Sequence, residues 1–130
     1  MKILIADDSS LIRTHLSDLI TTCRDDIEIY TSSDMHSTVE CLEMCAIHVL
    51  ILDIQFPDGS GFSVLEFLKH IESKPFVMVL TNLINETVRK KCLQLGADLF
   101  FDKTEDYEKV IEEIVGLHNI DMNDMEANQC

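Results

Sequence analysis

Asp53 is the side chain best placed to do chemistry, because it follows the most apolar run of the chain, Val49-Leu50-Ile51-Leu52. A continuous run of Val, Ile and Leu is typical of a strand buried on both faces of a parallel sheet, and ligands bind at the carboxyl ends of such strands. Residues 1–6 form a second apolar run, and Asp7 and Asp8 follow it. We therefore expect three carboxylates to meet at one edge of a sheet.

Three carboxylates at close range repel one another, and at least one would stay partly protonated unless a cation neutralised the group. Mg²⁺ fits best, with Mn²⁺ as its substitute, because it takes oxygen ligands and is usually held by one or two protein carboxylates and a phosphate oxygen. Asp and Ser also favour helix caps, so a competing interpretation is that Asp7 and Asp8 only cap the helix that follows.

Two further strand ends carry polar side chains of complementary chemistry. Thr81 follows the apolar run 76–80, and Lys103 stands shortly after the run 99–101. A transferring phosphoryl group has three equatorial oxygens, and a protein stabilises them mainly by position and charge. One oxygen could go to Mg²⁺, one to the Lys103 ammonium and one to the Thr81 hydroxyl. Asp53 is then the nucleophile, which would form an aspartyl-phosphate.

The elements that must position these residues alternate between strand and helix patterns, which predicts right-handed crossovers and a doubly wound α/β sheet. Strands are expected at residues 1–6, 27–30, 49–52, 76–80 and 99–101. Helices are expected after the Ser9-Ser10 caps, over 34–45, from Ser60-Gly61 to Lys74-Pro75, from Asn85 to Gly96, and from a Thr104 cap onward. The first of these helices carries an apolar stripe of Leu11, Ile12, His15, Leu16, Leu19 and Ile20.

Taken together, these residues resemble the receiver domain of two-component response regulators. The matching positions, in chain order, are Asp7-Asp8, Asp53, Pro57, Gly61, Thr81, Gly96-Ala97-Asp98 and Lys103. No single position is specific, but their order and spacing form a strong signal that covers residues 1–119. The resemblance implies a flavodoxin-like (βα)5 fold with a five-stranded parallel sheet of order 2-1-3-4-5.

The resemblance also implies a function and a ligand set. A histidine kinase or phosphotransfer protein would phosphorylate Asp53 in a Mg²⁺-dependent reaction, and a conformational switch would then signal to a protein partner through the face formed by residues 85–119. The domain itself would catalyse only its own phosphorylation and dephosphorylation. Mg²⁺ would be bound by Asp8, Asp53 and the backbone carbonyl of Gln55, with Asp7 contributing through water.

Some positions depart from the family's usual pattern or vary within it. Phe100 occupies the position of a switching Tyr, so it can rotate inward beside Thr81 but offers no hydroxyl. Thr104 stands where the family most often has a Pro that a cis peptide bond often precedes. Gln55 and Leu83 occupy positions that influence how fast the phosphoryl group is lost, so we expect them to set the lifetime of the signal.

Composition is consistent with one acidic domain. The chain has 130 residues, of which 46% are hydrophobic, enough for one core. Residues 1–119 are expected to form it, with 120–130 as a frayed acidic tail. Ten basic residues against 24 acidic ones give a net charge of -14, which argues against nucleic-acid binding. No signal peptide or membrane-spanning stretch is apparent, so we expect a cytoplasmic, single-domain protein without membrane contact.

Three alternatives stay open at this point. The first is a phosphatase with an aspartyl nucleophile, although Gln55 stands where such hydrolases usually place a second Asp. The second is a flavodoxin-like protein, because the same strand order can hold flavin mononucleotide. The third is a zinc site made by Cys41, Cys45 and His48, although closed zinc sites need four ligands.

Overall fold

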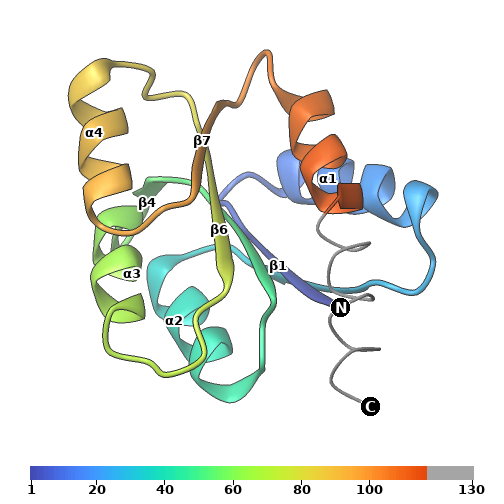
Figure 1. Ribbon diagram of the computed structural model, residues 1–130, viewed down its shortest axis with the longest axis horizontal. Helices are drawn as coiled ribbons and strands as arrows, with labels where there is room; N and C mark the ends of the chain where they lie inside the picture. Colours follow the sequence, from blue (N-terminus) through green and yellow to red (C-terminus); the bar gives the residue numbers. More distant parts are fainter. Residues whose placement is uncertain (117–130) are drawn as a thin grey trace.

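Five parallel strands form one sheet in the computed structural model, which describes residues 1–116 (Figure 1). From one edge to the other the strands are β2 (Glu28–Ser32), β1 (Lys2–Ala6), β3 (Val49–Leu52), β6 (Phe76–Thr81) and β7 (Leu99–Asp102). Counted along the chain, this is the predicted order 2-1-3-4-5. The central strand β3 is buried throughout, as its continuous apolar run predicts.

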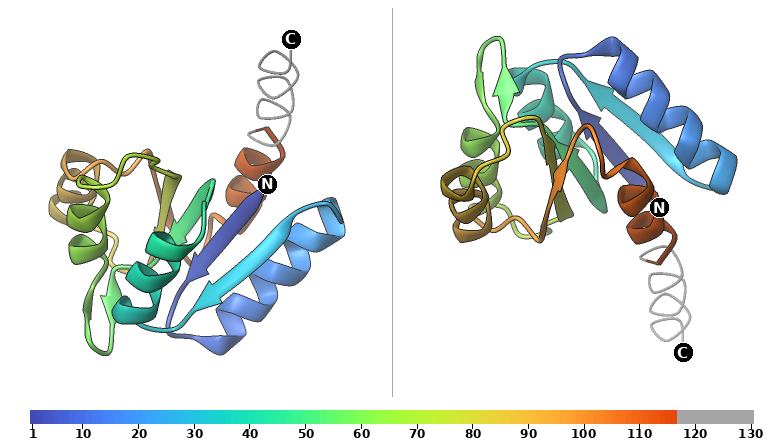
Figure 2. Two further views of the ribbon diagram at one scale, coloured as in Figure 1. Left: turned by 90° about the horizontal axis from the view of Figure 1, so that it is seen from below. Right: turned by 90° about the horizontal axis from the view of Figure 1, so that it is seen from above.

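Helices cover both faces of the sheet, which gives the molecule three layers (Figure 2). The helices are α1 (Ser10–Cys23), α2 (Met35–Met44), α3 (Gly61–Leu68), α4 (Glu86–Gln94) and a helix described over residues 107–116. Two apolar clusters fill the spaces between the sheet and the helices on its two faces. Leu16 of α1 and Val110 of the last helix belong to one cluster, while Leu42, Leu65 and Cys92 of α2, α3 and α4 belong to the other.

Three of the helices begin where their capping residues predict. The side chains of Ser9, Asp34 and Asn85 accept hydrogen bonds from the backbone N–H groups three residues on, at the starts of α1, α2 and α4. At the other end of α4, Gly96 has φ of 107°, a left-handed conformation that favours glycine and ends the helix.

Three local predictions were wrong. Thr104 does not cap the last helix, because its hydroxyl and its N–H both donate to Asp102 Oδ1, and the helix begins only at residue 107. The third helix ends at Leu68, well before Lys74-Pro75. The next two backbone N–H groups, of Lys69 and His70, donate to carbonyls three residues back in place of four, which tightens and ends the helix. Leu11 and His15 are not part of the buried stripe of α1, since Leu11 is 76% exposed and His15 is exposed as well.

A small hairpin of β4 (Gln55–Phe56) and β5 (Gly59–Ser60) follows Asp53, an element that was not predicted from the sequence. Asp58, in its turn, accepts hydrogen bonds from the backbone N–H groups of Met35 (2.8 Å) and His36 (3.0 Å) at the start of α2. Hydrogen bonds therefore hold the segment after Asp53 against the start of α2.

The peptide bond between Lys103 and Thr104 is trans, as are all peptide bonds in the described part of the chain. Within residues 1–116, none of the helices has the length and apolar character needed to cross a bilayer. The predicted boundary at residue 119, the tail 120–130 and the last part of the 85–119 face lie outside the described residues.

Candidate functional site

The sheet register brings Asp7 and Asp53 to the same edge. Each follows its strand directly, and each backbone N–H still donates to the neighbouring strand, from Asp7 to the Ser32 carbonyl and from Asp53 to the Ala6 carbonyl, both at 3.0 Å. Asp7 is 3% and Asp53 4% exposed, whereas Asp8 is exposed. Carboxylate oxygens of these three residues lie within 4.8 Å of one another, so the predicted convergence is confirmed.

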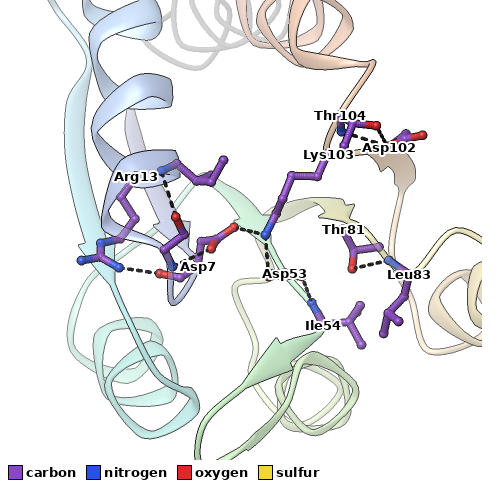
Figure 3. A network of polar contacts seen from close by, with 11 residues as sticks. Asp7, Arg13, Asp53, Ile54, Thr81, Leu83, Asp102, Lys103 and Thr104 are labelled. Atoms are coloured by element: carbon purple, nitrogen blue, oxygen red, sulfur yellow. Dashed lines mark hydrogen bonds and ion pairs between the residues drawn. The ribbon is translucent and has the colours of Figure 1, made fainter.

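Lys103 reaches into this group from the end of β7 (Figure 3). Its Nζ lies 2.7 Å from Asp53 Oδ2 and 2.7 Å from Asp7 Oδ2, and its side chain is almost fully buried. Its backbone N–H donates to the Thr81 carbonyl at 3.0 Å, which fixes the start of the lysine side chain next to β6. The sequence predicted a lysine near Asp53, but not that it would bridge two aspartates.

The pKa shifts of this group follow from burial and incomplete neutralisation. Burial raises the pKa of Asp7 above its ordinary value, although hydrogen bonds from Lys103 and the Ser9 N–H act in the opposite direction. Burial acts to lower the pKa of Lys103, but its hydrogen bonds to Asp53 and Asp7 raise it overall. The lysine therefore stays charged. Three carboxylates facing one ammonium leave an excess of negative charge at this edge of the sheet.

The backbone of the loop after β1 is held by its own polar contacts. Asp7 Oδ1 accepts from the Ser9 N–H at 2.9 Å, and the Arg13 guanidinium donates to the Asp7 carbonyl oxygen at 2.7 Å. These contacts leave Asp8 at the exposed rim. Sequence reasoning missed Arg13, because an arginine in the first turns of a helix is ordinary, and only the fold shows which carbonyl it reaches.

Asp53 keeps both oxygens in defined positions. Oδ1 accepts from the Ile54 N–H at 2.7 Å, and Oδ2 accepts from Lys103. The chain then turns back so closely that a Cβ on Gly61 would lie 2.4 Å from the Asp53 carbonyl oxygen. Gly61 also donates its N–H to the Ile54 carbonyl at 2.7 Å. A glycine is thus required where the segment returns to the acceptor strand.

Thr81 ends β6, the strand beside β3, and its side chain is fully buried (Figure 3). Its Oγ1 accepts a hydrogen bond from the Leu83 N–H at 3.2 Å. A hydroxyl has one donor and two acceptor positions, so this contact leaves its proton free to donate. Thr81 therefore stands at the end of the strand next to the one that Asp53 follows, and its hydroxyl proton can donate.

The three residues predicted to act on switching and lifetime differ in burial. Phe100 and Leu83 are partly buried and pack against the apolar cluster under α2, α3 and α4. Gln55 is exposed in β4, in the segment that follows Asp53.

The arrangement offers oxygen ligands alone, which suits a hard divalent cation. Among residues 1–116, Asp7, Asp8 and Asp53 are the one group of three or more His, Cys, Asp and Glu side chains close enough to share an ion. The zinc hypothesis therefore gains no support. His48 Nδ1 instead accepts a hydrogen bond from the Lys2 N–H at 2.9 Å.

Comparisons with known proteins agree on one family. The family model described as "Response regulator receiver domain" matches residues 3–115. A protein-glutamate methylesterase/protein-glutamine glutaminase from Methanospirillum hungatei is 30% identical over 86% of this chain and 33% of its own length. Response regulator RR06 of Streptococcus pneumoniae is 32% identical over 75% of this chain and 44% of its own length. The chain thus spans less than half the length of these curated relatives.

Solved structures show the same fold. The N-terminal domain of an uncharacterized protein from Wolinella succinogenes superposes with a TM-score of 0.83 at 26% identity, covering 95% of this chain and 98% of that one. A CheY-like receiver domain protein from Methanospirillum hungatei gives a TM-score of 0.81 at 20% identity, covering 96% and 97%. At such low identity the second likeness supports the fold alone.

Proposed function

The chain belongs to the response regulator receiver domain family, and from this premise we propose that it accepts a phosphoryl group on Asp53 and signals to a protein partner. The donor is a phosphohistidine on a histidine kinase or phosphotransfer protein. The receiver domain covers residues 1–119, and the reaction takes place in the cytoplasm. Apart from its own phosphorylation and dephosphorylation, the domain needs no catalytic activity for this role.

One observation carries the proposal. The Asp53 carboxylate is buried at the end of the central strand, yet it is held by a lysine at 2.7 Å and lies beside two further carboxylates. Charged groups are rarely buried together unless they are paired or serve a function. A reactive carboxylate with a fixed cation next to it is suited to accept a phosphoryl group.

The chemistry uses groups that are already in position. An Asp53 oxygen attacks the phosphorus in line with the leaving imidazole, a P–O bond forms as the P–N bond breaks, and the histidine keeps the electron pair. Lys103, already at the carboxylate, balances negative charge on the phosphoryl oxygens. The free proton of Thr81 donates to another of these oxygens.

The oxygen ligands and the excess negative charge fit Mg²⁺, or Mn²⁺ in its place. Asp8, Asp53 and the backbone carbonyl of Gln55 would hold the ion, and Asp7 would contribute through water. When bound, the ion supplies charge stabilisation for a phosphoryl oxygen. Asp8→Ala should therefore weaken Mg²⁺ binding without unfolding the protein, while Asp25→Ala, at another exposed aspartate, serves as the matched control.

Signalling follows from the bond that Thr81 gains only in the phosphorylated state. As Thr81 moves toward the phosphoryl group, it vacates space into which Phe100 turns, so the equilibrium between two conformations shifts. The partner surface is the face of residues 85–119, which begins at the N-cap of α4. Amide exchange with beryllofluoride, a phosphoryl mimic, should change on this face, and changes confined to the opposite face would contradict the proposal.

The family match does not favour the phosphatase or the flavin-binding alternative. A single experiment separates all three. The protein is incubated with acetyl phosphate and Mg²⁺, with the same mixture containing EDTA, and with flavin mononucleotide, and intact mass and absorbance are recorded. We expect one acid-labile phosphoryl adduct that depends on Mg²⁺ and no flavin absorbance. Rapid release of inorganic phosphate from unrelated phosphate esters would instead identify a phosphatase.

A further inference from the structure

Three sulfur-containing side chains gather at the carboxyl end of α2, on Cys41, Met44 and the C-cap residue Cys45. Met44 follows Cys41 by three residues, which makes the two neighbours on the helix surface, and the Cys45 backbone N–H donates to the Cys41 carbonyl. All three line one shallow hollow in the surface, whose other lining residues are Ser37 and Glu40. Met44 and Cys45 also border a second hollow that extends toward Phe67 of α3.

The side chains at this position are accessible and close to each other. Met44 is 77% exposed, which is unusual for a large apolar residue and leaves its thioether free to move. Cys41 and Cys45 are half-buried, and neither forms a disulfide. Both side chains line the same hollow, so a single ion could contact both sulfur atoms.

We propose that Cys41, Met44 and Cys45 form a binding site for a soft monovalent metal ion, Cu(I). Two thiolates and a thioether are the ligand set that selects Cu(I) over harder cations. Zinc is less suited, because a closed zinc site needs four ligands and His48 is engaged by the Lys2 N–H. The remaining lining groups of the hollow, a hydroxyl and a carboxylate, are hard ligands that do not compete for Cu(I).

Binding at this site exchanges protons for the metal without oxidation or reduction. Burial, together with the neighbouring thiol of Cys45, raises the pKa of Cys41 to about 11, so this thiol is protonated at neutral pH in the metal-free protein. The ion replaces the protons of both thiols, which are released to solvent, and two S–Cu bonds form beside the weaker thioether contact.

The site is remote from the aspartate group. The end of α2 leads into the amino end of β3, whereas Asp53 follows the carboxyl end of the same strand (Figure 1). Cu(I) at the end of α2 therefore shares no ligand with the proposed Mg²⁺ site, and either ion could bind without the other.

The test uses the whole reduced chain under anaerobic conditions, with Cu(I) as the probe and the chromophoric chelator bathocuproine disulfonate as competitor. Cys23→Ser is the matched control, because it removes an exposed thiol outside the proposed site. We expect wild type and this control to withhold one Cu(I) per chain from the chelator. Cys45→Ser should lose this capacity, and Met44→Leu, which changes only an exposed thioether, should bind more weakly.

The thermal unfolding of every variant is measured alongside, so that loss of fold is not mistaken for loss of a ligand. If Cys45→Ser is unfolded, Met44→Leu and Cys41→Ala decide the outcome. The proposal is overturned if wild type gives up all its copper, if the bound copper is lost in Cys23→Ser, or if folded Met44→Leu competes as well as wild type.

Discussion

Lys103 is the residue on which the metal-free site depends. Two buried carboxylates, those of Asp7 and Asp53, share its ammonium at 2.7 Å each. Removing one member of a buried ion pair leaves an uncompensated charge, which is more costly than the pair itself is worth. The same lysine must also be free to contact a phosphoryl oxygen, so its role in stability and its role in chemistry are linked.

Lys103→Met should therefore destabilise the fold by about 3 kcal/mol in the absence of divalent cations, because Asp7 and Asp53 lose their shared partner. Mg²⁺ should restore part of the loss, since it supplies the missing positive charge. Urea unfolding in EDTA and in Mg²⁺ measures both effects, with Lys109→Met, at an exposed lysine, as control. Equal stability of Lys103→Met and wild type in EDTA would show that the two buried ion pairs do not stabilise the fold.

Leu83 offers a second prediction at this scale. It is partly buried, packs against an apolar cluster and cannot orient a water molecule. Leu83→Glu should speed hydrolysis of the phosphorylated form by about fivefold, or about 1 kcal/mol of barrier, because a carboxylate can guide water in line with the phosphorus. The exposed amide of Gln55 keeps some of this capacity in the wild type.

The decay of the phosphorylated protein is compared with its thermal unfolding. If Leu83 only anchors the loop after β6, the substitution will lower the unfolding temperature and leave the decay rate unchanged. An unaltered rate in a well-folded Leu83→Glu protein would exclude a role in lifetime.

At the scale of elements, the hairpin after Asp53 is attached to α2 by Asp58, which accepts two hydrogen bonds from the start of that helix. Asp58→Ala should lower the free energy of unfolding by about 1 kcal/mol, as loss of a helix cap typically does. Asp58→Asn, which keeps an acceptor oxygen, should lose less. Denaturant unfolding measures the difference, and equal losses in the two variants would show that the contact does not depend on an acceptor at this position.

A buried thiol in α4 makes the free energy of unfolding depend on pH. Its one fully buried residue, Cys92, has a thiol pKa that burial raises from 9.0 to about 11. The unfolded chain therefore loses this proton at a lower pH than the folded chain, so stability falls as the pH rises from about 9 toward 11.

Cys92→Ala should be less stable at neutral pH, because it leaves a small cavity, but should show a shallower decline in stability across this alkaline range. Thermal unfolding at several pH values measures the slopes, with Cys23→Ala at the exposed end of α1 as control. A slope equal to that of wild type would mean that Cys92 ionises equally easily in both states.

The elements could be predicted where a local pattern determines them. Apolar runs gave the five strands, and Ser9, Asp34 and Asn85 gave three helix starts, because a cap acts on its own backbone. The hairpin was missed because it is held in part by a distant contact, from Asp58 to the start of α2. The Thr104 prediction failed for a local reason, because its hydroxyl bonds to Asp102, two residues back, and not to the helix that follows.

At the scale of the whole molecule, the parallel sheet accounts for most of the candidate site. Once the strand order was expected, Asp7, Asp53, Thr81 and Lys103 had to end near one edge, and the geometry agrees. Side-chain pairing could not be predicted in the same way. That Lys103 bridges Asp7 as well as Asp53, and that Arg13 holds the Asp7 carbonyl, depends on distances that only the packed layers define.

The measurement that tests the central claim most directly locates the phosphoryl group in the chain. Protein treated with acetyl phosphate and Mg²⁺ is reduced with borohydride, which converts an aspartyl-phosphate to homoserine, and its peptides are then sequenced by mass spectrometry. We predict homoserine at position 53 alone, and none in Asp53→Asn. Homoserine at Asp7 or Asp8 in the wild type, or an equal phosphoryl mass gain in Asp53→Asn, would contradict the assignment of Asp53 as the acceptor.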